Sequence, residues 1–243
     1  MKKANTLLLD MDGVLAEVSK SYQTAIVSTC RAFGATSVNL DLVATWKARG
    51  GCNNDWVLSL DLIKSDPLGK DDVTLQEVTD VFEALYQGDG MRPGLYTLET
   101  LIPSKQTLET LREKCDHMAI VTGRPRKDCN KFLLDFSIDH LFDVCVCMED
   151  GPLKPDPFPV TRALELLGVP PSDTVIMVGD TPDDIRSALA AGCRGIGVAT
   201  PENVSKSLSE NRAHDTCKIT RAMLECGAEI ILKPGFEELL NYF

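Results

Sequence analysis

Acidic side chains stand directly after two apolar segments of the sequence. They are Asp10 and Asp12 after residues 7–9, and Asp180, Asp183 and Asp184 after residues 175–178. If the two segments are neighbouring strands, three or four carboxylates meet at one sheet edge, where their repulsion requires a cation. Mg²⁺ is the hard cation that carboxylates usually hold, and it would also bind a phosphate oxygen. We therefore predict a magnesium site, with ordinary turns and helix starts as the alternative.

Two further segments end in residues suited to binding an anion. Thr122, Gly123 and Arg124 follow an apolar run, and a hydroxyl with the next backbone N–H groups can receive an anion. Lys154 lies between a predicted strand and a predicted helix, in a loop that Pro155 and neighbouring prolines stiffen. A lone lysine in a loop is usually solvated. A functional role is favoured only because Lys154, like the acidic residues and Thr122, follows a predicted strand.

Short apolar runs predict the strands that position these residues. They cover residues 6–9, 118–121, 144–148, 174–178, 195–198 and 229–232. Runs without alternation suit strands that are buried on both faces of a parallel sheet. Helices are predicted between them, over residues 103–114, 127–136, 158–167, 182–191 and, at the end, 236–242. The pattern indicates an α/β fold, with a three-layer Rossmann-like core around a central parallel sheet.

Two regions depart from this alternation. About a hundred residues separate the first two apolar runs, far more than a crossover needs, and residues 21–33 and 73–86 have helical apolar spacing. We therefore predict an all-helical cap domain at 16–91, inserted into a core domain of residues 1–15 and 92–243. The segment 200–226 is also long, with helices expected over 204–211 and 216–226, and peripheral packing or a subunit contact is its expected role.

The predicted cap contains one stretch, residues 46–56, that combines glycines with polar side chains. Gly50 and Gly51 permit close approach to a ligand, and Lys47, Arg49 and Asn53 could reach an anionic or polyhydroxylated leaving group. The alternative is a helix–loop–helix turn. In that interpretation Gly50-Gly51 ends one helix, Asn53 or Asn54 caps the next, and Trp56 packs inside the cap.

The composition excludes several classes of function. Asp and Glu exceed Lys and Arg by 36 to 25, for a formal charge of -11, so a nucleic-acid or anionic-membrane partner is not expected. The nine cysteines lack the spacing of zinc ligands and suggest buried thiols in a reducing compartment. No apolar stretch approaches the roughly 20 residues that span a bilayer. We expect a cytoplasmic monomer or homodimer.

The motifs occur in a fixed order along nearly the whole chain: Asp10-x-Asp12-Gly13, Thr122-Gly123, Lys154, and Gly179-Asp180 with Asp184 four residues later. This series resembles the four ordered motifs of the haloacid dehalogenase superfamily, and the insertion resembles the helical C1 cap of its subfamily I. The resemblance implies that Asp10 attacks phosphorus and forms an aspartyl-phosphate. It also implies that Asp12 protonates the leaving alcohol and then activates water.

The same resemblance implies the binding roles. Thr122 and the amide of Gly123 would bind the transferring phosphoryl group, with Arg124 also contacting the substrate, while Lys154 would offset its charge and hold Asp10. Mg²⁺ would be held by Asp10, the backbone carbonyl of Asp12 and Asp180. Asp184 would be the outer partner, with Asp183 as the alternative.

We therefore expect a Mg²⁺-dependent phosphomonoester hydrolase that acts on a small phosphorylated metabolite. One alternative is a sugar phosphomutase of the same fold, although His117, His140 and His214 all lie outside the predicted cap and so supply no cap acid–base pair. The other alternative is a non-catalytic phosphate-binding regulatory module.

Overall fold

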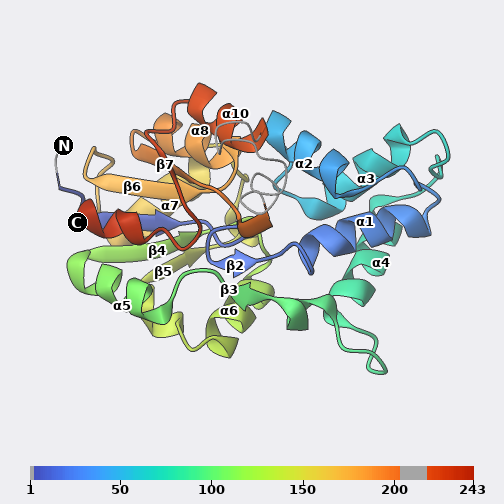
Figure 1. Ribbon diagram of the computed structural model, residues 1–243, viewed down its shortest axis with the longest axis horizontal. Coiled ribbons are helices and arrows are strands. Elements are labelled where there is room, and N and C mark those ends of the chain that lie inside the picture. Colours follow the sequence, from blue (N-terminus) through green and yellow to red (C-terminus); the bar gives the residue numbers. More distant parts are fainter. Residues whose placement is uncertain (1–2, 203–217) are drawn as a thin grey trace. The chain divides into compact units, whose positions relative to one another are not determined.

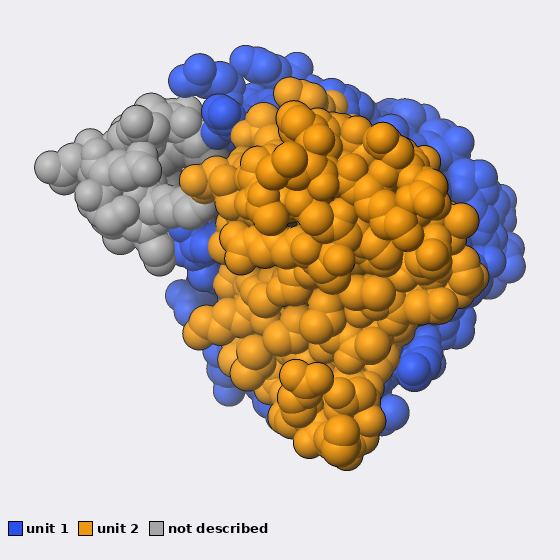
Figure 2. Space-filling model, turned by 90° about the vertical axis from the view of Figure 1, so that its right-hand side faces the viewer, with its two compact units in different colours: residues 1–17, 101–243 blue, residues 18–100 orange. Residues whose placement is uncertain are grey.

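The computed structural model describes residues 3–202 and 218–243, and the chain divides into two compact units. Unit 1 comprises Met1–Glu17 and Leu101–Phe243, and unit 2 comprises Val18–Thr100; Figure 2 colours them blue and orange. The first unit therefore combines two distant parts of the sequence. The predicted assignment of these parts as a core domain and a cap stays a prediction.

Unit 1 is built on a six-stranded sheet with the strand order β5-β4-β1-β6-β7-β8 (Figure 1). The strands are β1 (Thr6–Leu9), β4 (His117–Val121), β5 (Val144–Val146), β6 (Val175–Gly179), β7 (Arg194–Val198) and β8 (Ile231–Leu232). All neighbouring strands pair in parallel. Every residue of β1 and β6 is buried, which explains why these runs are apolar without alternation. The predicted α/β fold with a central parallel sheet is confirmed.

Strand β1 lies in the middle of this sheet. Leu9 pairs with Ile120 of β4 on one side and with Val178 of β6 on the other. The chain passes from β1 to β4 and β5 on one side of β1 and then crosses to β6, β7 and β8 on the other, so the strand order reverses beside β1. Ligands of open α/β sheets usually bind at such a point.

The helices of unit 1 follow the predicted segments closely. They are α5 (Lys105–Lys114), α6 (Arg126–Asp135), α7 (Phe158–Leu167), α8 (Pro182–Ala190) and α10 (Lys218–Glu225). Apolar side chains of α7 and α8 pack with Leu8, Ala119 and Met177 in one core cluster. The closing segment forms a 3₁₀ helix, Glu237–Asn241, as is common for runs this short. The helix predicted at 204–211 lies outside the described residues.

Unit 2 is helical, with α1 (Tyr22–Ala32), α2 (Leu40–Arg49), α3 (Asp55–Ser65), α4 (Leu75–Gln87) and the 3₁₀ helix Leu95–Leu98. Tyr22 of α1 stacks on Tyr86 of α4, with ring centroids 4.3 Å apart. The buried carboxylate of Glu99 accepts hydrogen bonds from Ser21 Oγ at 2.9 Å and Tyr86 Oη at 3.0 Å. These bonds attach the segment around Glu99 to helices of unit 2. The unit therefore ends at Thr100, beyond the predicted boundary at residue 91.

The glycine-containing stretch of unit 2 is a helix–loop–helix turn. Helix α2 ends at Gly50, whose φ of 87° is unfavourable for other residues. The side chain of Asn54 caps α3 by accepting hydrogen bonds from the backbone N–H groups of Trp56 and Val57, both at 3.1 Å. The predicted helix–loop–helix turn is thus present, with Asn54 as the cap, while Trp56 is only half-buried.

The short strands β2 (Ala16–Glu17) and β3 (Thr100–Leu101) form a separate two-stranded sheet at the two points where the chain passes between the units. None of the helices in the described ranges is long and apolar enough to cross a membrane.

Candidate active site

Three carboxylates meet at the carboxyl end of the central strand β1. Asp10 follows β1 directly and is fixed by the hydrogen bond that its backbone N–H donates to Val178 O, at 2.9 Å. Asp180 follows β6, and Asp184 lies in the first turn of α8. One oxygen of each of these carboxylates lies within 4.8 Å of the others. The sheet register therefore produces the predicted cluster, because β1 and β6 end side by side.

Two glycines leave the space that these carboxylates fill. A Cβ on Gly13 would lie 2.2 Å from Asp180 Oδ2, and the φ of Gly13 is +74°. A Cβ on Gly179 would lie 2.2 Å from Asp184 Cγ. Both distances are far below van der Waals contact, so any larger residue at either position would displace a carboxylate of the cluster.

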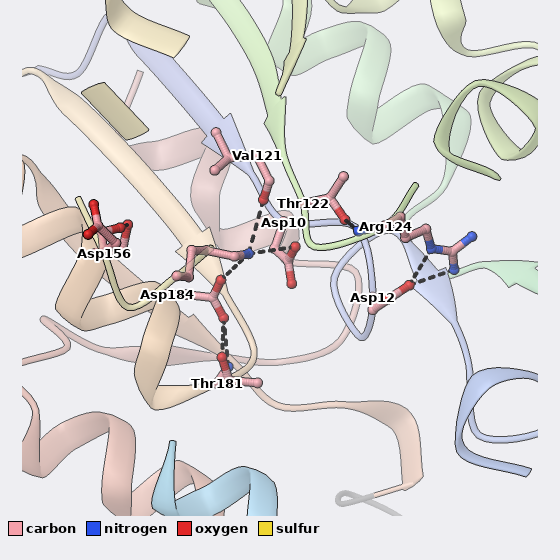
Figure 3. A network of polar contacts seen from close by, with 10 residues as sticks. Asp10, Asp12, Val121, Thr122, Arg124, Asp156, Thr181 and Asp184 are labelled. Carbon is pink, nitrogen blue, oxygen red and sulfur yellow. Dashed lines mark hydrogen bonds and ion pairs between the residues drawn. The ribbon is translucent and has the colours of Figure 1, made fainter. Parts of the chain in front are cut away.

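Lys154 is the cation of the cluster, and Figure 3 shows its three labelled partners, Asp10, Val121 and Asp184, with dashed contacts converging between them. Its Nζ lies 2.8 Å from Asp10 Oδ1 and 2.5 Å from Asp184 Oδ1, and it donates a hydrogen bond to Val121 O at 3.0 Å. The Lys154 side chain is only 2% exposed. A buried ammonium with two carboxylate partners and a carbonyl partner has its charge and its donors satisfied.

The electrostatic environment leaves Asp10 close to its titration point at neutral pH. Burial raises the pKa of Asp10 to about 7, and the negative charges of Asp184 and Asp12 add to this effect. The adjacent Lys154 acts in the opposite direction and lowers the pKa. Burial also opposes the charge of Lys154, but its two carboxylate partners outweigh that and raise the pKa of Lys154 above its usual value.

Asp183 and Asp184 differ in their contacts. Asp184 Oδ2 accepts hydrogen bonds from the backbone and the hydroxyl of Thr181, at 3.0 and 2.6 Å, which caps α8 and orients the carboxylate. Asp183 instead pairs with Arg186 Nη1 at 3.2 Å. The structure therefore brings Asp184, and not Asp183, into the carboxylate cluster.

The arginine beside the predicted phosphate-binding residues contacts Asp12. Arg124 Nε and Nη2 lie 2.6 and 2.5 Å from Asp12 Oδ1. The sequence predicted a substrate contact for Arg124 and did not indicate this pair. The only feature of the sequence that bears on this pair is the position of Arg124 two residues after Thr122. That position does not indicate which acidic residue the arginine contacts.

Thr122 and Gly123 form the turn after β4. The backbone N–H of Thr122 donates to Val146 O at 3.0 Å, and its buried hydroxyl oxygen accepts the N–H of Arg124 at 3.1 Å. The hydroxyl proton of Thr122 is not needed for this bond. The threonine therefore keeps a proton that it can donate, and its role in binding an anion stays a prediction.

The remaining predicted contact residues belong to unit 2 and contact other residues of that unit. Lys47 pairs with Asp55 at 3.1 Å, and the Arg49 guanidinium lies 5.6 Å from the ring centroid of Trp46. Asn53 is half-buried in the turn between α2 and α3. The substrate-binding roles of these residues stay predictions.

The cluster offers the donor set of a hard divalent cation. All its ligand atoms are carboxylate oxygens, which Mg²⁺ and similar ions prefer to nitrogen or sulfur. Carboxylates this close also repel one another, and one ammonium neutralises only part of their charge. The residues of this site therefore fit a divalent cation.

Comparisons with known proteins agree with the motifs. A family profile described as haloacid dehalogenase-like hydrolase matches residues 64–198. A phosphoglycolate phosphatase of Haemophilus influenzae is 32% identical over 209 residues, which cover 83% of this chain and 88% of that protein. A Bacteroides fragilis crystal structure of a protein described as haloacid dehalogenase-like superposes with a TM-score of 0.73 and 21% identity, covering 98% of this chain and 100% of the other.

A further relative is longer than this chain. A Phytophthora nicotianae protein named imidazoleglycerol-phosphate dehydratase is 46% identical over 237 residues, or 97% of this chain. The match covers 51% of that relative, so the chain spans about half of its length.

Replacing Lys154 with Met tests its electrostatic role. The substitution removes the charge that lowers the pKa of Asp10, while burial and the neighbouring carboxylates still raise it. We expect the pKa of Asp10 in metal-free protein to rise by about 1–3 pH units, the usual effect of losing an adjacent opposite charge. A pH titration of the carboxyl carbons by ¹³C NMR measures this. Lys131→Met, which removes an exposed partner of Asp135, is the control, and an unchanged Asp10 in Lys154→Met would contradict the assignment.

Proposed function

Because the chain belongs to the haloacid dehalogenase-like hydrolases and is similar to a phosphoglycolate phosphatase, we propose that it hydrolyses a small phosphate monoester with Mg²⁺, through an aspartyl-phosphate. The observation that carries this proposal is the cluster of Asp10, Asp180 and Asp184 around Lys154 at the end of β1. It combines a nucleophile, ligands for a cation and a fixed positive charge in one place.

In the first step an oxygen of Asp10 attacks phosphorus while the bond from phosphorus to the leaving alcohol breaks. Asp12 gives its proton to the leaving oxygen, so the alcohol departs neutral. Thr122 and the N–H of Gly123 donate to the oxygens of the transferring group, and Lys154 offsets the negative charge that gathers there.

In the second step water attacks phosphorus and gives its proton to Asp12. The bond between phosphorus and Asp10 breaks, which releases inorganic phosphate and restores the Asp10 carboxylate. The two steps together convert one ester and one water into an alcohol and phosphate, and each side chain returns to its starting state.

Asp10, Asp180, the carbonyl of Asp12 and, as the outer partner, Asp184 would hold the Mg²⁺. When bound, the ion supplies positive charge beside the phosphoryl oxygens. The helical unit 2 is proposed as a cap of the C1 type that selects the alcohol. The names of the relatives, which include a phosphoglycolate phosphatase and an imidazoleglycerol-phosphate dehydratase, support a small phosphorylated metabolite as the substrate class.

Asp10→Asn tests the nucleophile. We expect the variant to lose all but about one part in 10³ of the activity toward p-nitrophenyl phosphate, because an amide does not attack phosphorus. Release of p-nitrophenol by purified protein with Mg²⁺ measures this. Asp135→Asn is the matched control, since that aspartate is exposed and pairs only with Lys131 in the described residues. Full activity of Asp10→Asn would refute the mechanism.

Removal of the metal tests the cation. EDTA is expected to abolish turnover and excess Mg²⁺ to restore it. The metal competes with a proton for Asp10, whose pKa is about 7, so protonation blocks the ligand below that pH. The Mg²⁺ concentration for half-maximal activity should therefore rise as the pH falls below 7, by up to about tenfold per pH unit. A midpoint independent of pH would remove Asp10 from the ligands.

A panel of phosphorylated metabolites tests the substrate class and the mutase alternative. It should include phosphoglycolate, imidazoleglycerol phosphate and sugar phosphates, with inorganic phosphate as the measured product. We expect Lys47→Ala and Arg49→Ala to change kcat/KM for some substrates by about tenfold relative to others, the effect of one or two lost polar contacts. Lys64→Ala, on the exposed side of α3, is the control. Isomerised sugar phosphate without free phosphate would instead favour a mutase.

A further inference from the structure

The two aspartates of the first motif are held by different cations from different parts of the chain. Lys154 contacts Asp10, whereas Arg124 contacts Asp12. In Figure 3 the dashed contacts that converge from Asp10, Val121 and Asp184 are separate from those that join Arg124 to Asp12. Each cation therefore orients one carboxylate, although the two aspartates are only two residues apart.

The contact of Arg124 with Asp12 falls on one oxygen only. Nε and Nη2 of the guanidinium both lie on Oδ1, at 2.6 and 2.5 Å. Across the described parts of the chain, Oδ1 is the only Asp12 side-chain atom with a hydrogen bond or ion pair. The Asp12 side chain is 25% exposed, but that of Arg124 is 1% exposed. The solvent-exposed part of the Arg124–Asp12 pair is therefore the carboxylate of Asp12.

Arg124 itself is held in place from several directions. Its guanidinium carbon lies 5.4 Å from the ring centroid of Phe132 in α6. Its backbone N–H donates to Thr122 Oγ1 at 3.1 Å, and its carbonyl accepts the N–H of Met148 at the same distance. A planar guanidinium fixed in this way presents two nitrogens to one oxygen, Nε as a hydrogen-bond donor and Nη2 as an ion-pair partner, in a rigid geometry that a lysine ammonium does not offer.

We propose that Arg124 is a positioning residue for proton transfer: it clamps Oδ1 of Asp12 and thereby presents Oδ2 to the leaving oxygen of the substrate. The inference rests on the proposed phosphatase function. The guanidinium stays protonated and does not take part as an acid. The proton moves between Asp12 Oδ2 and the alcohol oxygen, as the bond from that oxygen to phosphorus breaks. Arg124 acts through Asp12 rather than on the substrate.

This role has a kinetic signature that a general loss of structure lacks. A p-nitrophenolate ion leaves without a proton, whereas an alkoxide needs one, so only alkyl esters depend on a well-placed acid. The quantity to compare is kcat/KM, because it includes only the steps up to departure of the alcohol and not the later hydrolysis of the aspartyl-phosphate.

The experiment compares Arg124→Met with the wild type on p-nitrophenyl phosphate, phenyl phosphate and an alkyl phosphate that the wild type hydrolyses. We expect kcat/KM to fall by about 10²-fold for the alkyl ester and by less than about tenfold for p-nitrophenyl phosphate, since general acids contribute about 10²–10⁴-fold. Asp12→Asn should show the same dependence on the leaving group. The double variant should be no worse than Asp12→Asn alone.

Two further variants separate positioning from folding. Arg124→Lys keeps the charge without the rigid fork and should recover part of the loss on alkyl esters. Arg126→Met removes a neighbouring arginine that pairs with Asp150, and it should show no dependence on the leaving group. Circular dichroism and thermal melting check that each variant is folded.

The outcomes distinguish this inference from the function on which it rests. A wild type that hydrolyses none of the esters overturns both. A wild type that is active, with an inactive Asp10→Asn and an Arg124→Met that loses the same factor on every ester, retains the function and overturns the positioning role. An additional loss in the double variant would also overturn it, because Arg124 would then act independently of Asp12.

Discussion

The repulsion among buried carboxylates at the end of β1 is the constraint on which the site depends. Asp10, Asp180 and Asp184 come within 4.8 Å of one another in a place where Asp10 is almost fully buried. Burial is the main reason that the pKa of Asp10 is raised to about 7, and the negative charges of Asp184 and Asp12 add to this effect. Lys154 offsets part of this charge from a loop that reaches across the strand ends. The sheet, the glycines and the α8 cap all serve to hold this set together.

The sequence was sufficient to predict the sheet and the meeting of the carboxylates, for physical reasons. Strands buried on both faces must be continuously apolar, so runs such as Val175–Val178 stand out, and the first polar residue after each marks the sheet edge. Parallel strands align their carboxyl ends, so Asp10 and Asp180 had to be close if β1 and β6 were neighbours. The ordered motifs and the family match lead to the same class of protein.

The contacts that the sequence did not indicate depend on side-chain direction. Arg124 could have faced solvent, substrate or either aspartate, and only the path of the chain after β4 and the ring of Phe132 select Asp12. Lys47 is paired with Asp55, a partner on the far side of a glycine turn that no periodicity reveals. The limit of unit 2 at Thr100 follows from the buried Glu99. A glutamate is usually a surface residue, so the sequence does not indicate that this one is buried. Such pairs depend on tertiary geometry, and residue types alone leave several partners open.

The split of unit 1 into Met1–Glu17 and Leu101–Phe243 has a consequence for the order of folding during synthesis. The central strand β1 is made before its partners β4 and β6, which follow only after the whole of unit 2 has been translated. Unit 2 is continuous in sequence, so its helices can fold together while the edges of β1 are still exposed and unpaired. A growing chain must therefore keep an apolar strand soluble until residue 179 has left the ribosome, and the aspartates that follow β1 contribute charge next to that exposed segment.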